Sequence, residues 1–166
     1  MSRFGNLEFE SQPTRPVSQR HAPLSDEFTC LAEARNAFGN AEFESSLRWY
    51  GRILEFSPRN LEAWTGQVRC LIELGQYKDA RVWADKALEK FPESGELLAA
   101  KAMALGRLGE TDVALAFSDA ALDQPGDSAF VWLARGDVLL ARRERKVDPC
   151  FDRALQLAPE IGRAHV

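Results

Sequence analysis

A bulky residue followed four positions later by a smaller one returns at a constant period of about 34 residues along this chain, and that period restricts the possible folds more than any other feature. The pairs are Cys30 and Ala34, Trp64 and Val68, Leu98 and Ala102, and Trp132 and Gly136. Each period holds two segments whose apolar residues recur at the spacing of an α-helix. Self-similarity of this length predicts helical hairpins stacked into a solenoid.

Prolines set the boundaries of the repeats. Pro58, Pro92, Pro125 and Pro159 follow one another at nearly the same period as the bulky and small pairs. Because proline lacks an amide hydrogen and disfavours helix at the residue before it, each one is expected to close a hairpin. The repeats are therefore predicted at about 27–60, 61–94, 95–128 and 129–160, within a domain of residues 25–160.

The turns inside the hairpins are less regular than the helices. In the second repeat we expect helices over about 61–74 and 77–90, with Gly75 in the turn at positive φ. In the first repeat Ala41 occupies the turn position, so Gly39 and Asn40 are expected to make the turn instead. The fourth repeat has no turn glycine, and we expect Asp148 to cap a shortened helix that starts at Pro149 and ends near residue 157.

Both ends of the chain depart from the repeat. Residues 1–24 are rich in Pro, Gly, Ser and Gln and are predicted to be a flexible tail. Within it, residues 4–12 match residues 38–46 at seven of nine positions, which indicates a relic half-repeat. Pro13 and Pro16 argue against a fifth folded unit, so the relic either docks in place of the first hairpin turn or is a duplication without present use.

The C-terminal remnant, residues 161–166, is too short to form a helix that covers Phe151 and Leu155. Because a solenoid needs a polar cap at its end, we expect the chain to be part of a longer repeat protein. The alternative is self-association through this uncapped end.

Composition excludes several classes of function. With 21 Lys and Arg against 25 Asp and Glu, the net charge of −4 gives no overall attraction to nucleic acid or anionic lipid, whose binding needs a concentrated basic face. No apolar stretch is long enough for a signal peptide or a membrane span, so a cytoplasmic protein without membrane attachment is expected. Cys30, Cys70 and Cys150 are too widely spaced for a zinc site and are expected to be reduced thiols. His21 and His165 lie near the chain ends, so no nucleophile has an evident base; no catalytic residue, metal or cofactor is predicted.

The second repeat resembles the tetratricopeptide repeat family through Trp64, Gly75, Tyr77, Ala80, Ala87 and Pro92. The resemblance implies an all-α, right-handed solenoid of about four repeats and eight helices, part of a longer protein of the bacterial type. It also implies a protein interaction module, an adaptor or scaffold, without catalysis. Alternatives are a dedicated chaperone for one amphipathic client, or the repeat segment of a larger enzyme or regulator. A related RNA-binding repeat of about 35 residues is disfavoured by the acidic balance.

The resemblance further implies that the first helix of each repeat lines a concave groove that binds a peptide or helix of a partner. The corresponding residues are Phe28, Leu31, Arg35, Phe38, Glu62, Thr65, Arg69, Ile72, Glu73, Glu96, Ala99, Met103, Arg107, Phe130, Leu133, Asp137 and Leu140. Arg35, Arg69 and Arg107 could hold a peptide carboxylate. Alternatively, the arginines pair with Glu62, Glu73 and Glu96 and only solvate this face.

Chaperone-tail receptors of this family hold the tail with a clamp of basic and amide side chains. The clamp positions carry Leu31, Arg35, Gly66, Glu96 and Ala100 in this chain. Because Arg35 alone among them is basic, a clamp of that kind is not expected.

Overall fold

The computed structural model describes residues 24–160, and these residues form eight α-helices and no β-strand. The helices are α1 (Leu24–Gly39), α2 (Phe43–Phe56), α3 (Leu61–Glu73), α4 (Tyr77–Lys90), α5 (Gly95–Arg107), α6 (Thr111–Leu122), α7 (Ala129–Ala141) and α8 (Asp148–Leu157). The all-α fold predicted from the sequence is confirmed. The helices expected over about 61–74 and 77–90 are α3 and α4.

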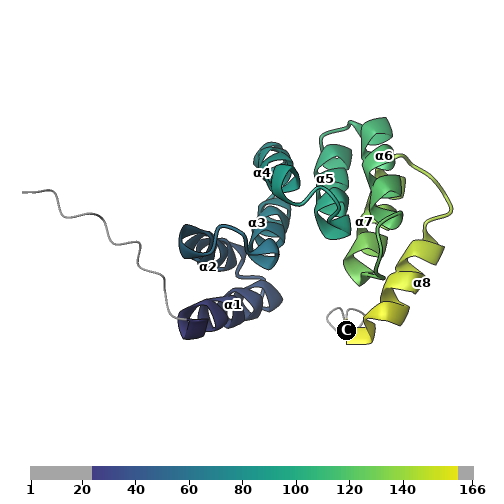
Figure 1. Ribbon diagram of the computed structural model, residues 1–166. Coiled ribbons are helices and arrows are strands. Elements are labelled where there is room, and N and C mark those ends of the chain that lie inside the picture. The colour runs from purple at the N-terminus through teal and green to yellow at the C-terminus, as the bar shows by residue number, and fades with distance from the viewer. Residues whose placement is uncertain (1–23, 161–166) are drawn as a thin grey trace, which may run out of the picture.

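Consecutive helices pack as hairpins, α1 with α2, α3 with α4, α5 with α6 and α7 with α8, and the hairpins follow one another along an arch (Figure 1). The first helices also contact one another, α3 with α5 and α5 with α7. They therefore face the inner side of the arch, and the second helices form its outer side (Figure 1).

All four hairpin turns use the same backbone geometry at equivalent positions of the repeat. The left-handed residues are Ala41 (φ 60°), Gly75 (φ 73°), Gly109 (φ 85°) and Arg143 (φ 60°). In each turn the next amide donates back to the helix, as Gln76 N does to Leu71 O at 2.9 Å and Glu42 N to Ala37 O at 2.8 Å. These bonds complete the helix C-terminus and require positive φ whatever residue stands there.

The prediction that Gly39 and Asn40 make the first turn was right for Asn40, which forms the turn with Ala41, and wrong for Gly39. Gly39 is the last residue of α1, and Ala41 adopts the left-handed conformation itself. The repeat register decides the turn here, because the closing hydrogen bonds and the packing of both helices outweigh the steric cost to one alanine.

The start of α8 also differs from the expectation. Asp148 is the first helical residue and Val147 is the N-cap, so Asp148 does not cap the helix. Val147 is only 9% exposed and packs with Leu139 and Cys150, while its carbonyl accepts from Cys150 N at 3.0 Å. Burial of Val147 thus places the boundary one residue earlier. Pro149 lies in the first turn, where no amide donor is needed.

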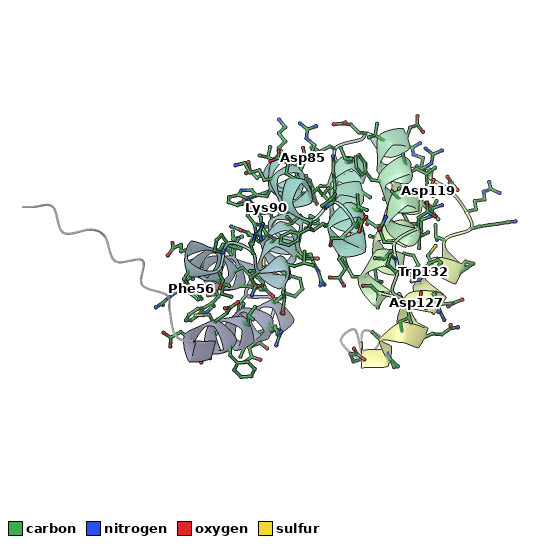
Figure 2. The ribbon with its side chains drawn as sticks, in the orientation of Figure 1. Phe56, Asp85, Lys90, Asp119, Asp127 and Trp132 are labelled. Atoms are coloured by element: carbon green, nitrogen blue, oxygen red, sulfur yellow. The ribbon has the colours of Figure 1, made fainter. Side chains whose placement is uncertain are left out.

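The core is built from large side chains seated against small ones. Phe151 covers Gly136, where a Cβ would lie 2.6 Å from the ring, and the rings of Trp64 and Trp83 pack at 5.6 Å. Trp132 packs where α7 meets α8 (Figure 2). Cys30, Cys70 and Cys150 are buried free thiols, as predicted.

Residues 1–23 and 161–166 lie outside the described part of the chain, and so do the predictions about the tail, its relic half-repeat and the C-terminal remnant. Helix α1 starts at Leu24, one residue inside the predicted tail. None of the helices described in residues 24–160 has the length and apolarity needed to cross a membrane.

Candidate functional site

A pocket of about 950 Å³ opens on the inner side of the arch. Its walls come from α1, α3, the starts of α5 and α7, and the loops that precede α5 and α7, with one residue each from α2 and α6. We call it the inner groove, and the residues that line it are Arg35, Phe38, Gly39, Tyr50, Leu61, Glu62, Thr65, Gly66, Arg69, Glu93, Ser94, Gly95, Glu96, Ala121, Gln124, Pro125, Gly126, Asp127, Ser128 and Val131.

The structure brings together six of the residues predicted to line the groove. These are Arg35, Phe38, Glu62, Thr65, Arg69 and Glu96. The others lie outside its lining: Phe28, Leu31, Ile72, Glu73, Ala99, Met103, Arg107, Phe130, Leu133, Asp137 and Leu140. Ile72 and Ala99 are buried in the helix packing, whereas Phe28 is 71% exposed near the start of α1.

Tyr50 and the loop residues were not predicted from the sequence, because the groove was assigned to first helices alone. Tyr50 belongs to α2 but reaches the groove across Gly66 of α3. A Cβ on Gly66 would lie 2.7 Å from Tyr50 Cε1, so the ring fits only because that side chain is absent. The signal was present in the sequence: Gly66 stands where the next two repeats carry Ala100 and Ala134.

The hydroxyl of Tyr50 stays protonated at neutral pH. The ring is 5% exposed, and this burial, together with the nearby Glu62 carboxylate, raises the pKa of Tyr50 to about 12. Tyr50 therefore presents the groove with a neutral hydroxyl that can donate or accept a hydrogen bond.

Two of the three arginines predicted in the groove already bind carboxylates. Arg35 forms a two-pronged pair with Glu62, with Nε to Oε1 and Nη2 to Oε2 both at 2.5 Å. Arg107 forms a similar pair with Asp137, with Nε to Oδ2 at 3.2 Å. The alternative in which these arginines pair along the groove is thus confirmed for Arg35 with Glu62.

Arg69 is different, and the same alternative was wrong for it. Its guanidinium makes no ion pair or hydrogen bond to any residue in the described range, and its buried Nε has no acceptor there. Glu96, which stands one repeat after Glu62, instead accepts from Ser128 Oγ at 2.7 Å.

Two aromatic rings hold the Arg69 guanidinium in place. Its Cζ lies 4.8 Å from the ring centre of Phe38 and 4.2 Å from that of Phe130. These rings come from α1 and α7, so Arg69 links the first hairpin to the fourth across the inside of the arch. Ring faces attract the cation but accept none of the hydrogen bonds in the guanidinium plane.

The lining of the groove also contains carboxylates. Glu93 is exposed and has no ion pair with a described residue, and one oxygen of Glu96 binds Ser128. Asp127 lies in the loop between α6 and α7 beside α8, where it accepts from Arg153 Nη2 at 2.6 Å (Figure 2). Arg69, Glu93 and Glu96 are therefore the charged residues of the groove lining that form no ion pair with a described residue.

Residues 24–160 contain no group of three or more His, Cys, Asp or Glu side chains placed to hold a metal ion. His21 and His165 lie outside this range. What the described groove offers is hydrogen bonding, charge and apolar contact.

Stacked helical hairpins around an open inner groove define a helical-repeat protein. Residues 31–104 match the sequence model of the tetratricopeptide repeat. Together with the fold, this match shows that residues 31–104 are tetratricopeptide repeats. No curated protein sequence matches it.

Solved structures share this fold at low sequence identity. A thermophilic TPR protein of Thermus thermophilus has a TM-score of 0.70 and 22% identity, over 83% of this chain and 78% of that one. The first TPR of Spaghetti (RPAP3), bound to an HSP90 peptide, has a TM-score of 0.63 and 11% identity, over 75% and 99% of the two chains. The TPR2B domain of yeast Sti1 in a complex with pHsp70 has a TM-score of 0.56 and 20% identity, over 80% and 98%.

Proposed function

We propose that this protein is an adaptor or scaffold that binds a peptide or helix of a partner protein in the inner groove and performs no catalysis. The observation that carries the proposal is the groove itself, an opening of about 950 Å³ whose lining runs from Arg35 in α1 to Val131 in α7. A site that draws on all four hairpins is suited to an elongated ligand.

The lining has the composition of a recognition surface. Leu61 is 40% exposed at its edge and Phe38 is partly buried, so both can contact apolar side chains. Arg69 and the Tyr50 hydroxyl add hydrogen-bonding groups that fix the orientation of a ligand. Two solved structures share this fold: that of Spaghetti (RPAP3) is bound to an HSP90 peptide, and that of yeast Sti1 is a complex with pHsp70. The first of them supports a peptide as the ligand.

Selection from a display library of random short peptides on the immobilised full chain tests the proposal. Selected peptides are then made with a fluorophore, and their affinities are measured by fluorescence anisotropy. We expect enrichment of specific sequences that compete with one another for one site. The proposal fails if no peptide is enriched above the empty support.

Photo-crosslinking locates the bound peptide. The benzophenone amino acid p-benzoylphenylalanine replaces either Leu61 at the groove or Val82 on α4, residues that are 40% and 46% exposed. The two sites are matched in exposure and apolar character, and only Leu61 lines the groove. We expect crosslinks from position 61 and not from position 82; crosslinks from position 82 alone would place the binding surface on the outer side.

A further inference from the structure

We propose that the inner groove selects peptides of mixed charge, in which a carboxylate binds Arg69 and Tyr50 and a basic side chain at another position binds Glu93 and Glu96. This inference rests on the proposed peptide-binding function and specifies the class of partner segment. It follows from which charges in the groove remain unpaired.

The first anchor is the Arg69 guanidinium. The equivalent arginine of the first repeat, Arg35, binds the carboxylate of Glu62 through two nitrogens at 2.5 Å. Arg69 stands one repeat later with no carboxylate among the described residues, and its Nε is buried without an acceptor. The terminal Nη1 and Nη2 atoms are not buried in this way, so a peptide carboxylate can bind them, and a two-pronged bond of this kind is among the stronger polar contacts in proteins.

The position of Arg69 favours such a ligand. The rings of Phe38 and Phe130 lie 4.8 and 4.2 Å from its Cζ and hold the guanidinium between them. The side chain is therefore ordered before a ligand arrives, and binding loses less conformational entropy than it would with a free arginine. The neutral Tyr50 hydroxyl lines the same groove and can donate a further hydrogen bond to the bound carboxylate.

The second anchor is the pair of carboxylates at the start of α5. Glu93 has no ion pair with a described residue, and Glu96 is bound by the Ser128 hydroxyl alone. Asp127, which also lines the groove, is already neutralised by Arg153 at 2.6 Å. A lysine or arginine of the peptide would be attracted here.

The balance of unpaired charge excludes the simpler alternatives. Arg69 alone favours an acidic peptide, but Glu93 and Glu96 repel one; a basic peptide meets the reverse conflict. A peptide with both signs complements both kinds of unpaired charge, and like-charge contacts weaken the binding of other sequences. The groove therefore differs from one of uniform positive charge.

The test uses fluorescein-labelled pools of short peptides, randomised over uncharged residues and supplemented with acidic residues, basic residues, both, or neither. Anisotropy titrations with the full chain at low salt give the apparent affinity of each pool. We expect the mixed pool to bind about tenfold more tightly than the uncharged pool, the gain expected for one strong charged contact. Equal binding of the pools, or tightest binding by the purely acidic or purely basic pool, overturns the inference but leaves the groove as a binding site. Binding by none of the pools overturns the proposed function as well.

Two variants assign the preference to the two anchors. Arg69→Gln should remove most of the gain that acidic residues give, and Glu93→Gln should lower the gain from basic residues about threefold, as for an exposed charge. Glu93 has no ion pair to lose among the described residues, so its variant keeps the test valid even if Arg69→Gln disturbs the fold. The control is Arg81→Gln, because Arg81 pairs with Glu110 at 2.9 Å and does not line the groove. An unchanged charge preference in both Arg69→Gln and Glu93→Gln contradicts the assignment.

Discussion

The ring of Tyr50 in α2 lies directly on Gly66 in α3, at a site where a Cβ on the glycine would be 2.7 Å from Tyr50 Cε1. The equivalent positions of the next two repeats carry Ala84 with Ala100 and Ser118 with Ala134. The first junction between hairpins thus joins a large residue to an empty site, whereas the later ones join two small residues. This pairing also places the Tyr50 hydroxyl at the inner groove.

Gly66→Ala should destabilise the protein. The added methyl group must displace a buried ring, and overpacking of this kind costs about 1 to 3 kcal/mol, more than the gain of about 1 kcal/mol in helix propensity. Urea denaturation followed by circular dichroism measures the change. Gly51→Ala is the matched control in α2, since its Cβ would approach only Gln67 Nε2 at 3.9 Å, and it should stabilise. Equal stability of the two variants would show that the Tyr50 ring moves freely.

The left-handed turn residues make a second prediction. Ala41→Gly and Arg143→Gly should each raise the free energy of unfolding by about 0.5 to 1 kcal/mol, because both residues have φ of 60° and glycine removes the steric cost. Gly75→Ala should lower it by about 1 kcal/mol, although its Cβ would have nothing within 4 Å. Urea midpoints test all three variants, and a loss of stability in both glycine variants would contradict this explanation of the turns.

A third prediction concerns alkaline pH. Burial raises the pKa of Tyr50 from 10.0 to about 12, so the folded state retains a proton that the unfolded state loses. The contribution of this proton to the free energy of unfolding is complete below pH 10 and disappears as the pH rises towards 12, a loss of about 2 to 3 kcal/mol. Tyr50→Phe should therefore lose less stability than the unchanged protein over this range. Burial also raises the pKa of Cys70, but Cys70 is present in both proteins, so their difference reports Tyr50. Parallel stability curves would contradict the burial of the hydroxyl.

Arg69→Met should separate stability from binding. The change removes two contacts between a cation and a ring, each worth about 0.5 to 1 kcal/mol. The present Nε is buried without an acceptor, which destabilises the folded state by about 1 to 3 kcal/mol, and the substitution removes this cost. Methionine also packs well against aromatic rings. We expect the free energy of unfolding to stay level or rise by about 1 kcal/mol while the affinity for acidic and mixed-charge peptides falls. A large loss of stability would indicate that Arg69 is mainly a structural residue.

The fold could be predicted from the sequence because the repeat imposes the same backbone bonds in every hairpin. Ala41 and Arg143 adopt the same left-handed turn as Gly75 and Gly109. The repeat register therefore predicts the position of each turn better than the conformational preference of the single residue there. The predicted start of α8 was one residue too late, because the burial of Val147 cannot be inferred from its neighbours in the sequence.

The groove was harder to predict, because equivalent residues make different contacts. Ser94 accepts a hydrogen bond from Leu97 N and caps α5, so its hydroxyl does not bind Glu62. Glu62 instead pairs with Arg35. Ser128, at the same position of the next repeat, makes no such cap and instead donates to Glu96. The two serines occupy equivalent positions but make different hydrogen bonds, so Arg35 has a carboxylate partner and Arg69 has none among the described residues. This difference depends on side-chain geometry alone.

The most direct test of the groove as the binding surface is a map of amide chemical shifts. A peptide from the display selection is added to the ¹⁵N-labelled full chain, and the amide chemical shifts of the labelled chain are followed to saturation. We expect the largest changes at Thr65, Arg69 and Glu96 and around the start of α7, with little change along the outer helices α4 and α6. Changes concentrated on α4 and α6, with the signals of Thr65, Arg69 and Glu96 unmoved, would contradict the account.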